Sequence, residues 1–479
     1  MNPLAQELNN ELQKPSCPVF SLLSRRGRRI YFPSKGILGQ SAQARGKKIN
    51  ATIGTAFEED GSPMTLEALE AMISLPSETF LYAPSPGLQP LREEWKKMLI
   101  SKNPGLAGKA ASLPVVSSAL THALSVCAYL FVDEGDQIIV PDLYWDNYDL
   151  IFVESFGGEL KTHNTFAGQN YDMPALAATL AEGKVGKRIV LLNFPNNPTG
   201  YTVTVSEAKA LCEILRKSAE AGNQILVILD DAYFGLVYED GVLTESLFSS
   251  LCDLHPNILV AKLDGPTKED YVWSFRVGFM TFAWKGATPE QLRAIEGKAA
   301  GAVRASISNA SGIAQSLLLK AYTHPSYAEQ KRAKYEILKE RYAKIRALFA
   351  SHPEYAETFE PMPFNSGYFM CVRCKGADPE MVRQELLKSF DTGVIVLAGL
   401  VRLAFSAVPL ADLWAFCRST GIPFFGAPHH SGRAGKYRDF TDPAYDPAAE
   451  PRHKGMSLLI AEKGPGFVVA KKLKKLGYR

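Results

Sequence analysis

The chain has 479 residues, of which 46% are hydrophobic and 22% charged, and its formal net charge is +3. This composition is ordinary for a globular protein of roughly two to three domains, and so small a charge gives no general attraction to nucleic acid or anionic membranes. The sequence has no run of about eighteen apolar residues that could span a membrane, and its seven cysteines are scattered, which favours a reducing compartment. We therefore expect a cytoplasmic protein that binds neither nucleic acid nor membranes.

The N-terminal part of the chain predicts short elements. Its first residues, MNPLAQELNNELQKP, are polar and lack the apolar segment of a signal peptide. Residues 50–57 predict a short strand, and residues 65–73 and 91–101 predict helices. Between these helices, the segment YAPSPG at 82–87 predicts a rigid loop, because its prolines and glycine fix the backbone.

Apolar runs alternate with helical spacing after residue 113, as expected for a parallel sheet that helices cover on both faces. Strands are predicted at 113–116, 137–140, 188–194, 224–229 and 257–263, and helices at 121–132, 173–180 and 205–219. Long helices follow at 289–299, 312–323 and 327–350, and then strands at 368–373 and 401–406. The charged helix at 327–350 is predicted to be the hinge to a second, smaller domain.

Polar residues follow three consecutive core strands of the predicted sheet. The strands RIVLLNF, QILVIL and NILVAKL are followed in turn by Asn197, by Asp230 with Tyr233, and by Lys268. Open α/β sheets bind ligands beyond the carboxyl ends of their strands, so these side chains are expected at one edge. Lys268 follows a predicted turn at 264–267, and Arg276 lies eight positions further on.

These residue types suit a pyridine cofactor that carries both an aldehyde and a phosphate. A lysine such as Lys268 condenses with a carbonyl to a Schiff base once the pKa of its ammonium group is lowered. A buried carboxylate such as Asp230 can keep the ring nitrogen of the cofactor protonated, which makes the ring an electron sink. Asn197 and Tyr233 can donate hydrogen bonds to the ring oxygen.

The sequence also contains candidate residues for binding the phosphate and for stacking on the ring of such a cofactor. A phosphate favours a helix N-terminus together with a fixed cation, and Ser118, Thr121 and Arg276 would provide both. Trp145 could stack on the ring. Each residue has a structural alternative, since Asp230 could cap the next helix and Trp145 could belong to the core. Their joint occurrence at strand ends favours the cofactor site.

Several motifs together resemble a known family. They are NNPTG at 196–200, DDAY at 230–233, and Lys268 followed by RVG at 276–278, with further likeness at 50–54, 82–87 and 401–402. The combination resembles the fold-type I pyridoxal-phosphate enzymes of aminotransferase class I/II, and within them the aspartate aminotransferase group. The resemblance covers roughly residues 30–415.

This resemblance implies an α/β fold with a large domain that binds pyridoxal 5′-phosphate through a mostly parallel sheet flanked by helices. A smaller α+β domain would be formed by both chain ends. The domain boundaries that we predict are 1–70 for the N-terminal part of the small domain, 71–299 for the large domain and 300–420 for the C-terminal part of the small domain.

The resemblance also implies roles for single residues. The catalytic residues would be Lys268, Asp230 and Tyr233. The cofactor-binding residues would be Ser118, Thr121, Trp145, Asn197, Asp230, Tyr233, Lys268 and Arg276, with Tyr82 reaching across from the second subunit of a homodimer. The substrate-binding residues would be Gly54, Asn197, Arg402 at the α-carboxylate and Arg304 at a distal carboxylate, although an arginine on a loop could equally be structural. Departures from the family pattern are Ala119 and Leu120 at the phosphate turn, and Gly265 and Thr267 before the lysine.

The implied function is transfer of an amino group between an L-amino acid, dicarboxylic or aromatic, and a 2-oxo acid. A lyase or decarboxylase of the same fold is one alternative, because the cofactor chemistry is shared. A non-catalytic fused or truncated relative is the other. No metal is expected, since strand alternation sends the sulfur atoms of the CxxC pair Cys371 and Cys374 to opposite faces.

The C-terminal tail, 421–479, differs from the rest. Residues 422–451 are rich in Pro, Gly, His and Arg, without helical or strand periodicity. Residues 453–479 resemble a piece of the middle β-domain of acyl-CoA dehydrogenases, without the catalytic base of that family. We interpret the tail as fused or disordered, through a fusion, a frameshift or an assembly error near residue 420; the alternative is a lineage-specific extension.

Overall fold

The structure, a computed structural model, describes residues 1–13, 36–52, 54–67 and 81–413, together with Leu23, Arg28, Arg29, Leu75 and Thr79. The predicted tail at 421–479 and most of the helix predicted at 65–73 lie outside the described residues. Among the helices that are described, none is both long and apolar enough to cross a membrane.

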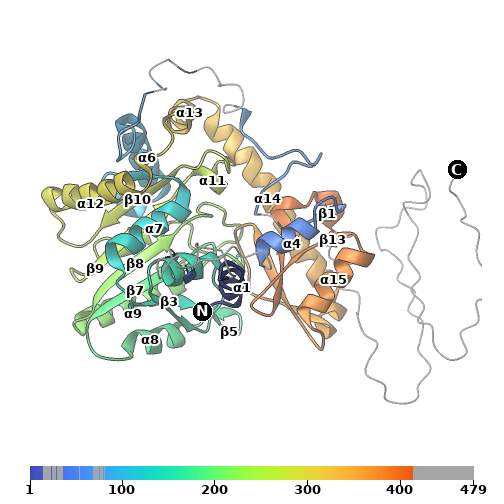
Figure 1. Cartoon of the computed structure of the whole chain (residues 1–479). Helices are drawn as coiled ribbons and strands as arrows, with labels where there is room; N and C mark the ends of the chain where they lie inside the picture. Colours follow the sequence, from blue (N-terminus) through green and yellow to red (C-terminus); the bar gives the residue numbers. More distant parts are fainter. Residues whose placement is uncertain are drawn as a thin grey trace, which may run out of the picture. The chain divides into compact units, whose positions relative to one another are not determined.

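A seven-stranded sheet of order β2-β10-β9-β8-β7-β3-β4 forms the centre of the large part of the fold (Figure 1). Its strands are β2 (Val115–Ser117), β3 (Gln137–Pro141), β4 (Glu159–His163), β7 (Lys187–Leu192), β8 (Gln224–Asp230), β9 (Ile258–Asp264) and β10 (Gly278–Ala283). Strands β4, β3, β7, β8 and β9 run parallel, and β10 runs antiparallel to both of its neighbours. The predicted α/β class with a mostly parallel sheet is therefore confirmed.

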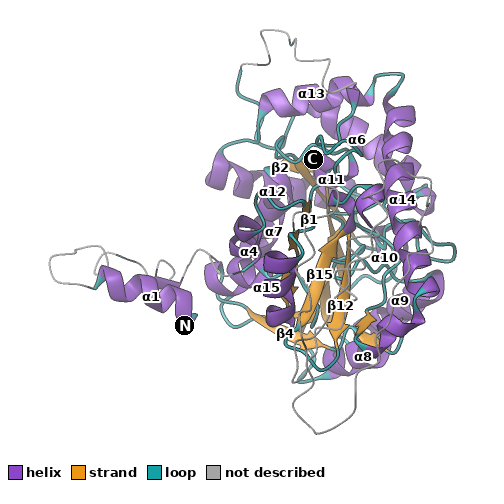
Figure 2. Ribbon diagram, turned by 90° about the vertical axis from the view of Figure 1, so that its right-hand side faces the viewer, coloured by secondary structure: helices purple, strands orange, loops and turns teal. Residues whose placement is uncertain are grey.

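Both faces of this sheet are buried, which explains why its central strands are continuous apolar runs. In β7, Val190 and Leu192 belong to one core cluster, and Ile189 and Leu191 belong to another. Consecutive side chains of a strand point to opposite faces, so one strand contributes to both cores. The first cluster includes residues of α8 (Met173–Ala181), α9 (Val205–Glu220) and α10 (Phe248–Leu251), and the second includes residues of α7 (Ala119–Phe131) and α12 (Pro289–Ile307). Figure 2 shows these two helix groups on opposite sides of the strands.

A smaller antiparallel sheet has the order β11-β12-β15-β14. Its strands are β11 (Phe359–Pro361), β12 (Phe369–Cys374), β14 (Ile395–Leu397) and β15 (Leu400–Ala404), and the nearby helices are α4 (Ile37–Gln43), α14 (Tyr327–Ser351) and α15 (Pro379–Ser389). An N-terminal strand, β1 (Ile49–Asn50), pairs in parallel with β13 (Thr392–Gly393). The buried Arg341 of α14 donates to the carbonyls of Phe57 and Ser406, so segments from both ends of the described chain meet here.

The remaining elements are short or peripheral. They are α1 (Pro3–Leu12), α6 (Gln89–Lys102), α11 (Pro266–Glu269), α13 (Gly312–Tyr322), the π-helix Asp149–Ser155, the hairpin of β5 (Phe166–Ala167) and β6 (Asn170–Tyr171), and 3-10 turns at Pro104–Leu106, Pro353–Glu357 and Phe405–Ala407.

Three local predictions were wrong. The strand expected at 50–57 ends at Asn50, because the Asn50 side chain accepts from the Thr52 backbone N–H and hydroxyl and turns the chain. The turn expected at 264–267 is the end of β9 followed by the helix α11, which begins at Pro266. Arg304 lies in the last turn of α12 and not on a loop, because Ala302 and Val303 keep that helix packed against the core.

Candidate active site

One cavity of about 370 Å³ lies at the carboxyl ends of β7, β8 and β9. A volume of this size is typical of small-molecule sites, and open α/β sheets bind ligands at this edge. The residues around the cavity come from the ends of these strands, the start of α7, the N-terminal segment and the smaller sheet. Segments that are far apart in the sequence therefore contribute to one site.

Asp230, the last residue of β8, presents a buried carboxylate to the cavity. Its Oδ2 accepts a hydrogen bond of 2.6 Å from the hydroxyl of Tyr148, and its backbone carbonyl accepts one of 2.7 Å from the Asn193 amide. Burial raises the pKa of the Asp230 carboxyl, while the Tyr148 hydrogen bond and the charge of Lys268 partly offset that rise. The carboxylate is thus suited to face a positive charge in the cavity.

Lys268 lies in α11, directly after β9. Its Nζ is 4.9 Å from the ring centroid of Tyr233, and its backbone carbonyl accepts a hydrogen bond of 2.9 Å from the hydroxyl of Tyr368. Burial lowers the pKa of the Lys268 amine; Asp230 opposes this decrease and Arg276 adds to it. A lowered pKa increases the fraction of neutral, nucleophilic amine.

The start of α7 and Arg276 form an end of the cavity that suits an anion. Ala119, Leu120 and Thr121 line the cavity at the first turn of α7, where backbone N–H groups have no intrahelical partner. Gly278 lets β10 approach this turn, since a Cβ there would lie 2.8 Å from the backbone carbonyl carbon of Ala119. The RVG motif therefore supplies both a cation and the close approach that brings it to the helix.

Arg402, on β15 of the smaller sheet, supplies a second cation to the cavity, where it could bind a second anion. Its side chain is buried, with Nη1 donating to Asn197 Oδ1 at 2.9 Å and Nη2 to the Thr52 carbonyl at 3.1 Å. The guanidinium carbon lies 4.3 Å from the ring centroid of Phe369. Burial lowers the pKa of Arg402, but a guanidinium remains charged at neutral pH. Two contacts thus fix a planar cation inside the cavity.

Nine of the twelve residues singled out from the sequence line the cavity, namely Gly54, Thr121, Trp145, Asn197, Asp230, Tyr233, Lys268, Arg276 and Arg402. Ser118 does not; its backbone N–H donates to His122 Nδ1, just before the three residues that do line it. Tyr82 is 93% exposed, and Arg304 is exposed with Nη1 donating to Ser308 Oγ at 2.7 Å. Neither lines the cavity of its own chain, and their roles stay predictions.

Sequence reasoning missed several residues of the site. Tyr148 and Asn193 contact Asp230, and Thr52, Thr267 and Phe369 line the cavity. Thr267 and Asn193 could have been found because each is the polar residue beside a strand-end motif. Tyr148 gave no such signal, since it follows no predicted strand directly and lies 82 positions before Asp230 in the sequence.

The sequence model of the family described as aminotransferase class I and II matches residues 47–419 of the chain. The chain belongs to this family. The match ends at residue 419 and so does not bear on residues 421–479.

Individual aminotransferases agree with this membership. The chain is 27% identical over 268 residues to the aspartate aminotransferase of Geobacillus stearothermophilus, covering 53% of this chain and 60% of that protein. It is 30% identical over 204 residues to the LL-diaminopimelate aminotransferase of Gloeobacter violaceus, covering 41% and 48%. The chain thus spans about three fifths of the first of these relatives.

Solved aminotransferase structures share the fold. An aminotransferase from Anaerococcus prevotii superposes with a TM-score of 0.73 at 21% identity, covering 82% of this chain and 97% of that one. The aspartate aminotransferase from Saccharomyces cerevisiae cytoplasm superposes with a TM-score of 0.67 at 18% identity, covering 85% and 98%.

This aminotransferase family depends on pyridoxal 5′-phosphate, and the residues of the cavity fit that cofactor. Two buried polar atoms on its walls, Thr267 Oγ1 and Arg402 Nε, have no hydrogen-bond partner among the described residues. Buried polar atoms are costly without a partner, so each marks a place for a ligand group. Thr267 Oγ1 lies next to Lys268 in the chain, where a phosphorylated aldehyde would bind. Arg402 Nε belongs to the buried guanidinium, where a carboxylate would bind.

Proposed function

We propose that this protein is a pyridoxal-phosphate-dependent aminotransferase that moves an amino group between an L-amino acid and a 2-oxo acid. The observation that carries the proposal is the cavity in which Lys268, Asp230 and Arg402 meet from α11, β8 and β15. An amine, a buried carboxylate and a buried guanidinium are the three groups that this reaction needs. A cytoplasmic homodimer is part of the proposal.

Most polar residues of the cavity have a place in the proposed binding mode. The N-terminus of α7 with Thr121, Thr267 and Arg276 holds the phosphate. Asp230 holds the proton on the ring nitrogen, Asn197 and Tyr233 donate to the ring oxygen, and Trp145 stacks on the ring. The bound cofactor supplies an aldehyde that takes up the amine and a ring that withdraws electrons.

The protein's own groups then act on the amino acid. Arg402 binds its α-carboxylate, with Asn197 and Gly54 beside that group, and this contact orients the α-carbon. The amine of Lys268, whose pKa burial lowers, takes the proton from the α-carbon and returns it. The hydrophobic walls around these groups exclude water and strengthen the electrostatic contacts.

The amino acid is proposed to be dicarboxylic or aromatic. Several relatives are named aspartate aminotransferases, which supports a dicarboxylic donor. Arg304 and Tyr82 lie outside the cavity of their own chain, so in the proposed homodimer they would reach the site only from the second subunit. Leu81 and Ile313 are 72% and 44% exposed, and the backbone of Leu81 lies beside Gly312, so two exposed apolar side chains close to Tyr82 support a second copy at this face.

The absorbance spectrum of the protein reconstituted with pyridoxal 5′-phosphate tests the proposal. We expect a visible band that is present in wild type and in Lys285→Ala, a change at an exposed lysine, and that is lost in Lys268→Ala. Absence of the band in wild type would refute the cofactor assignment.

Addition of aspartate, glutamate or tyrosine without a 2-oxo acid then distinguishes the reaction types. An aminotransferase releases about one equivalent of 2-oxo acid per site and stops, because the amino group stays on the cofactor. Continued turnover under these conditions would show a lyase or decarboxylase instead. No reaction with any amino acid would show a non-catalytic relative.

A further inference from the structure

Two buried carboxylates follow Lys268 directly in the chain. Glu269 and Asp270 are 4% and 0% exposed, and neither lines the cavity. Buried carboxylates need cations or several donors, because the loss of water is otherwise too costly. Their partners therefore show how the segment that carries Lys268 is held in place.

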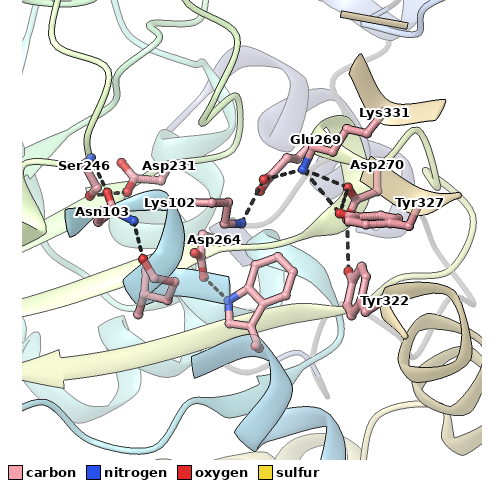
Figure 3. Close-up of polar contacts among 12 residues, drawn as sticks. Lys102, Asn103, Asp231, Ser246, Asp264, Glu269, Asp270, Tyr322, Tyr327 and Lys331 are labelled. Carbon is pink, nitrogen blue, oxygen red and sulfur yellow. Dashed lines mark hydrogen bonds and ion pairs between the residues drawn. The ribbon is translucent and has the colours of Figure 1, made fainter. Parts of the chain in front are cut away.

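Lysines from two other helices neutralise this pair (Figure 3). Lys331 of α14 places its Nζ 2.6 Å from Glu269 Oε1 and 3.0 Å from Asp270 Oδ1. Lys102, the last residue of α6, places its Nζ 2.8 Å from the same Glu269 oxygen. Two negative charges thus face two positive charges behind α11.

Hydroxyl groups complete the environment of Asp270. Tyr322 of α13 donates to Oδ2 at 2.9 Å and Tyr327 of α14 donates to Oδ1 at 2.7 Å, as Figure 3 shows. The Asp270 backbone N–H donates to the Pro266 carbonyl at 2.8 Å, which closes the turn of α11. The end of α11 is therefore fastened to α6, α13 and α14 at once.

The charge balance of this group is sensitive to each lysine. Burial raises the pKa of Glu269, but the charges of Lys102 and Lys331 outweigh this effect and bring it to about 2. The charges of Asp270 and Glu269 raise the pKa of Lys331 against the opposing effect of burial. Glu269 and Lys331 are thus charged at neutral pH, and losing one cation from this group leaves an uncompensated negative charge next to the segment of Lys268.

We propose that Lys331, together with Lys102, is a positioning residue for Lys268, because it neutralises the two carboxylates that follow Lys268 and fixes α11 against α14. The inference rests on the proposed function only for the chemistry of Lys268. Breaking a buried ion pair is strongly destabilising, so these contacts hold α11 in one position. Because their charges cancel, they do not favour the charged form of the Lys268 amine.

The charged and titratable groups around this region set the sign of the expected effects. Those that act on Lys268 are Asp230 and Arg276, with the Tyr233 ring beside its Nζ. Lys102, Lys331, Tyr322 and Tyr327 contact Glu269 or Asp270 directly, and Tyr271 and Tyr368 lie close enough to interact with the charge of Asp270. Removal of the Lys331 charge adds net negative charge and favours the ammonium form of Lys268, whereas removal of the Glu269 charge does the opposite.

The test measures the reactivity of the Lys268 amine in the full chain without added cofactor. Cyanate labels neutral amines and is small enough for the cavity, and peptide mass spectrometry quantifies labelling of Lys268 at a series of pH values. We expect the midpoint of the labelling profile to move up by about one pH unit in Lys331→Met and down in Glu269→Gln. The double variant Lys331→Met with Glu269→Gln returns the midpoint close to the wild-type value.

Lys334→Met is the matched control. Lys334 lies on the same helix with 22% side-chain exposure and a 2.6 Å ion pair to Glu58, compared with 25% and 2.6 Å to Glu269 for Lys331. We expect no change of the Lys268 midpoint in this control. With cofactor, Lys331→Met is expected to lower kcat about tenfold with little change in KM, since the proton transfer step suffers and Arg402 does not.

Equal midpoints in Lys331→Met and Lys334→Met would overturn the inference, as would shifts of the same sign in Lys331→Met and Glu269→Gln. If Lys331→Met does not fold, the Glu269→Gln midpoint decides alone: a downward shift supports the inference and an unchanged midpoint refutes it. Labelling needs neither cofactor nor turnover. A failure of the proposed function therefore leaves this measurement intact.

Discussion

At the scale of single residues, Tyr148 is the hydrogen-bond donor that opposes the effect of burial on the Asp230 carboxyl. Its hydroxyl is buried and donates at 2.6 Å, and this hydrogen bond lowers the pKa of Asp230 while burial raises it. In Tyr148→Phe the pKa of Asp230 rises further, so the carboxylate is lost at a higher pH. We expect kcat to fall about tenfold, which corresponds to the free energy of a hydrogen bond to a charged group. We also expect the acid limb of the pH profile of kcat to move to higher pH.

Tyr144→Phe is the control for this change. Tyr144 stacks near Tyr148 and donates to a different carboxylate, Asp149, at 3.1 Å, but it does not line the cavity. Its pH profile of kcat is expected to match wild type. An unchanged acid limb in Tyr148→Phe would contradict the positioning role of this tyrosine.

Arg402 permits a second prediction at this scale. Lysine keeps the charge but not the planar fork of donors, so Arg402→Lys loses the contact to Asn197 or to the Thr52 carbonyl. We expect kcat/KM for the amino acid to fall about a hundredfold, which corresponds to roughly 3 kcal/mol and is typical of a disrupted buried charge contact. Steady-state kinetics with the amino acid identified in the half-reaction measure this.

Arg383→Lys shows whether the loss is specific. Arg383 is also a buried arginine, 3% exposed and paired with Glu380 at 2.7 Å, but it lies in α15 outside the cavity. Its kcat/KM is expected to stay within about twofold of wild type. Comparable losses in both variants would indicate a general cost of replacing buried arginines.

At the scale of elements, the NNPTG turn is held against the smaller sheet by the absence of a side chain at Gly200. This residue has a φ of 73°, and a Cβ there would lie 1.9 Å from the Phe369 carbonyl oxygen of β12. Gly200→Ala must therefore push the turn and β12 apart. We expect a loss of at least about 3 kcal/mol in the free energy of unfolding, measured by urea denaturation.

Gly241→Ala separates the two causes of this loss. Gly241 has a similar φ of 79° but no heavy atom within 4 Å of its hypothetical Cβ. Only backbone strain remains there, so we expect a loss of about 1 kcal/mol. If both variants lose the same amount, the contact between the turn and β12 does not matter.

Elements that the sequence predicted well are those in which one physical signal dominates. The strands β7, β8 and β9 are buried on both faces and therefore read as apolar runs, which in β9 only the buried and ion-paired Lys262 interrupts. The helix α11 was missed because four residues give no periodicity, and Pro266 alone marks its start. Buried charges such as Glu269 read as solvent-exposed loop residues until their partners on other helices are known.

At the scale of the whole molecule, the order of strand ends predicted one site, and the cavity contains most of the residues expected there. The contribution of Ile37 and Ser41 from α4 could not be predicted, because it depends on Gln40, which exchanges hydrogen bonds with the Val396 backbone. Contacts between segments more than three hundred residues apart carry no local signal in the sequence.

The proposed function includes a homodimer in which Tyr82 of one subunit reaches the cavity of the other. Tyr82 is exposed beside other exposed apolar residues, and it lies outside the cavity of its own chain. A closed homodimer would bury this face and could bring Tyr82 to the cavity of the second subunit. Two different inactivating changes can then be placed in different chains of one dimer.

Heterodimers of a Tyr82→Ala chain and a Lys268→Ala chain, each with its own affinity tag, test this arrangement after purification over both tags. If Tyr82 serves the partner's cavity, one site carries both changes and the other carries neither, so we expect about half of the wild-type activity per dimer. Heterodimers of Lys268→Ala and Arg402→Lys chains are the control, because both residues line the cavity of one chain and each site keeps one defect. Activity equal to only half that of the Tyr82→Ala homodimer would place Tyr82 in its own chain's site or in none.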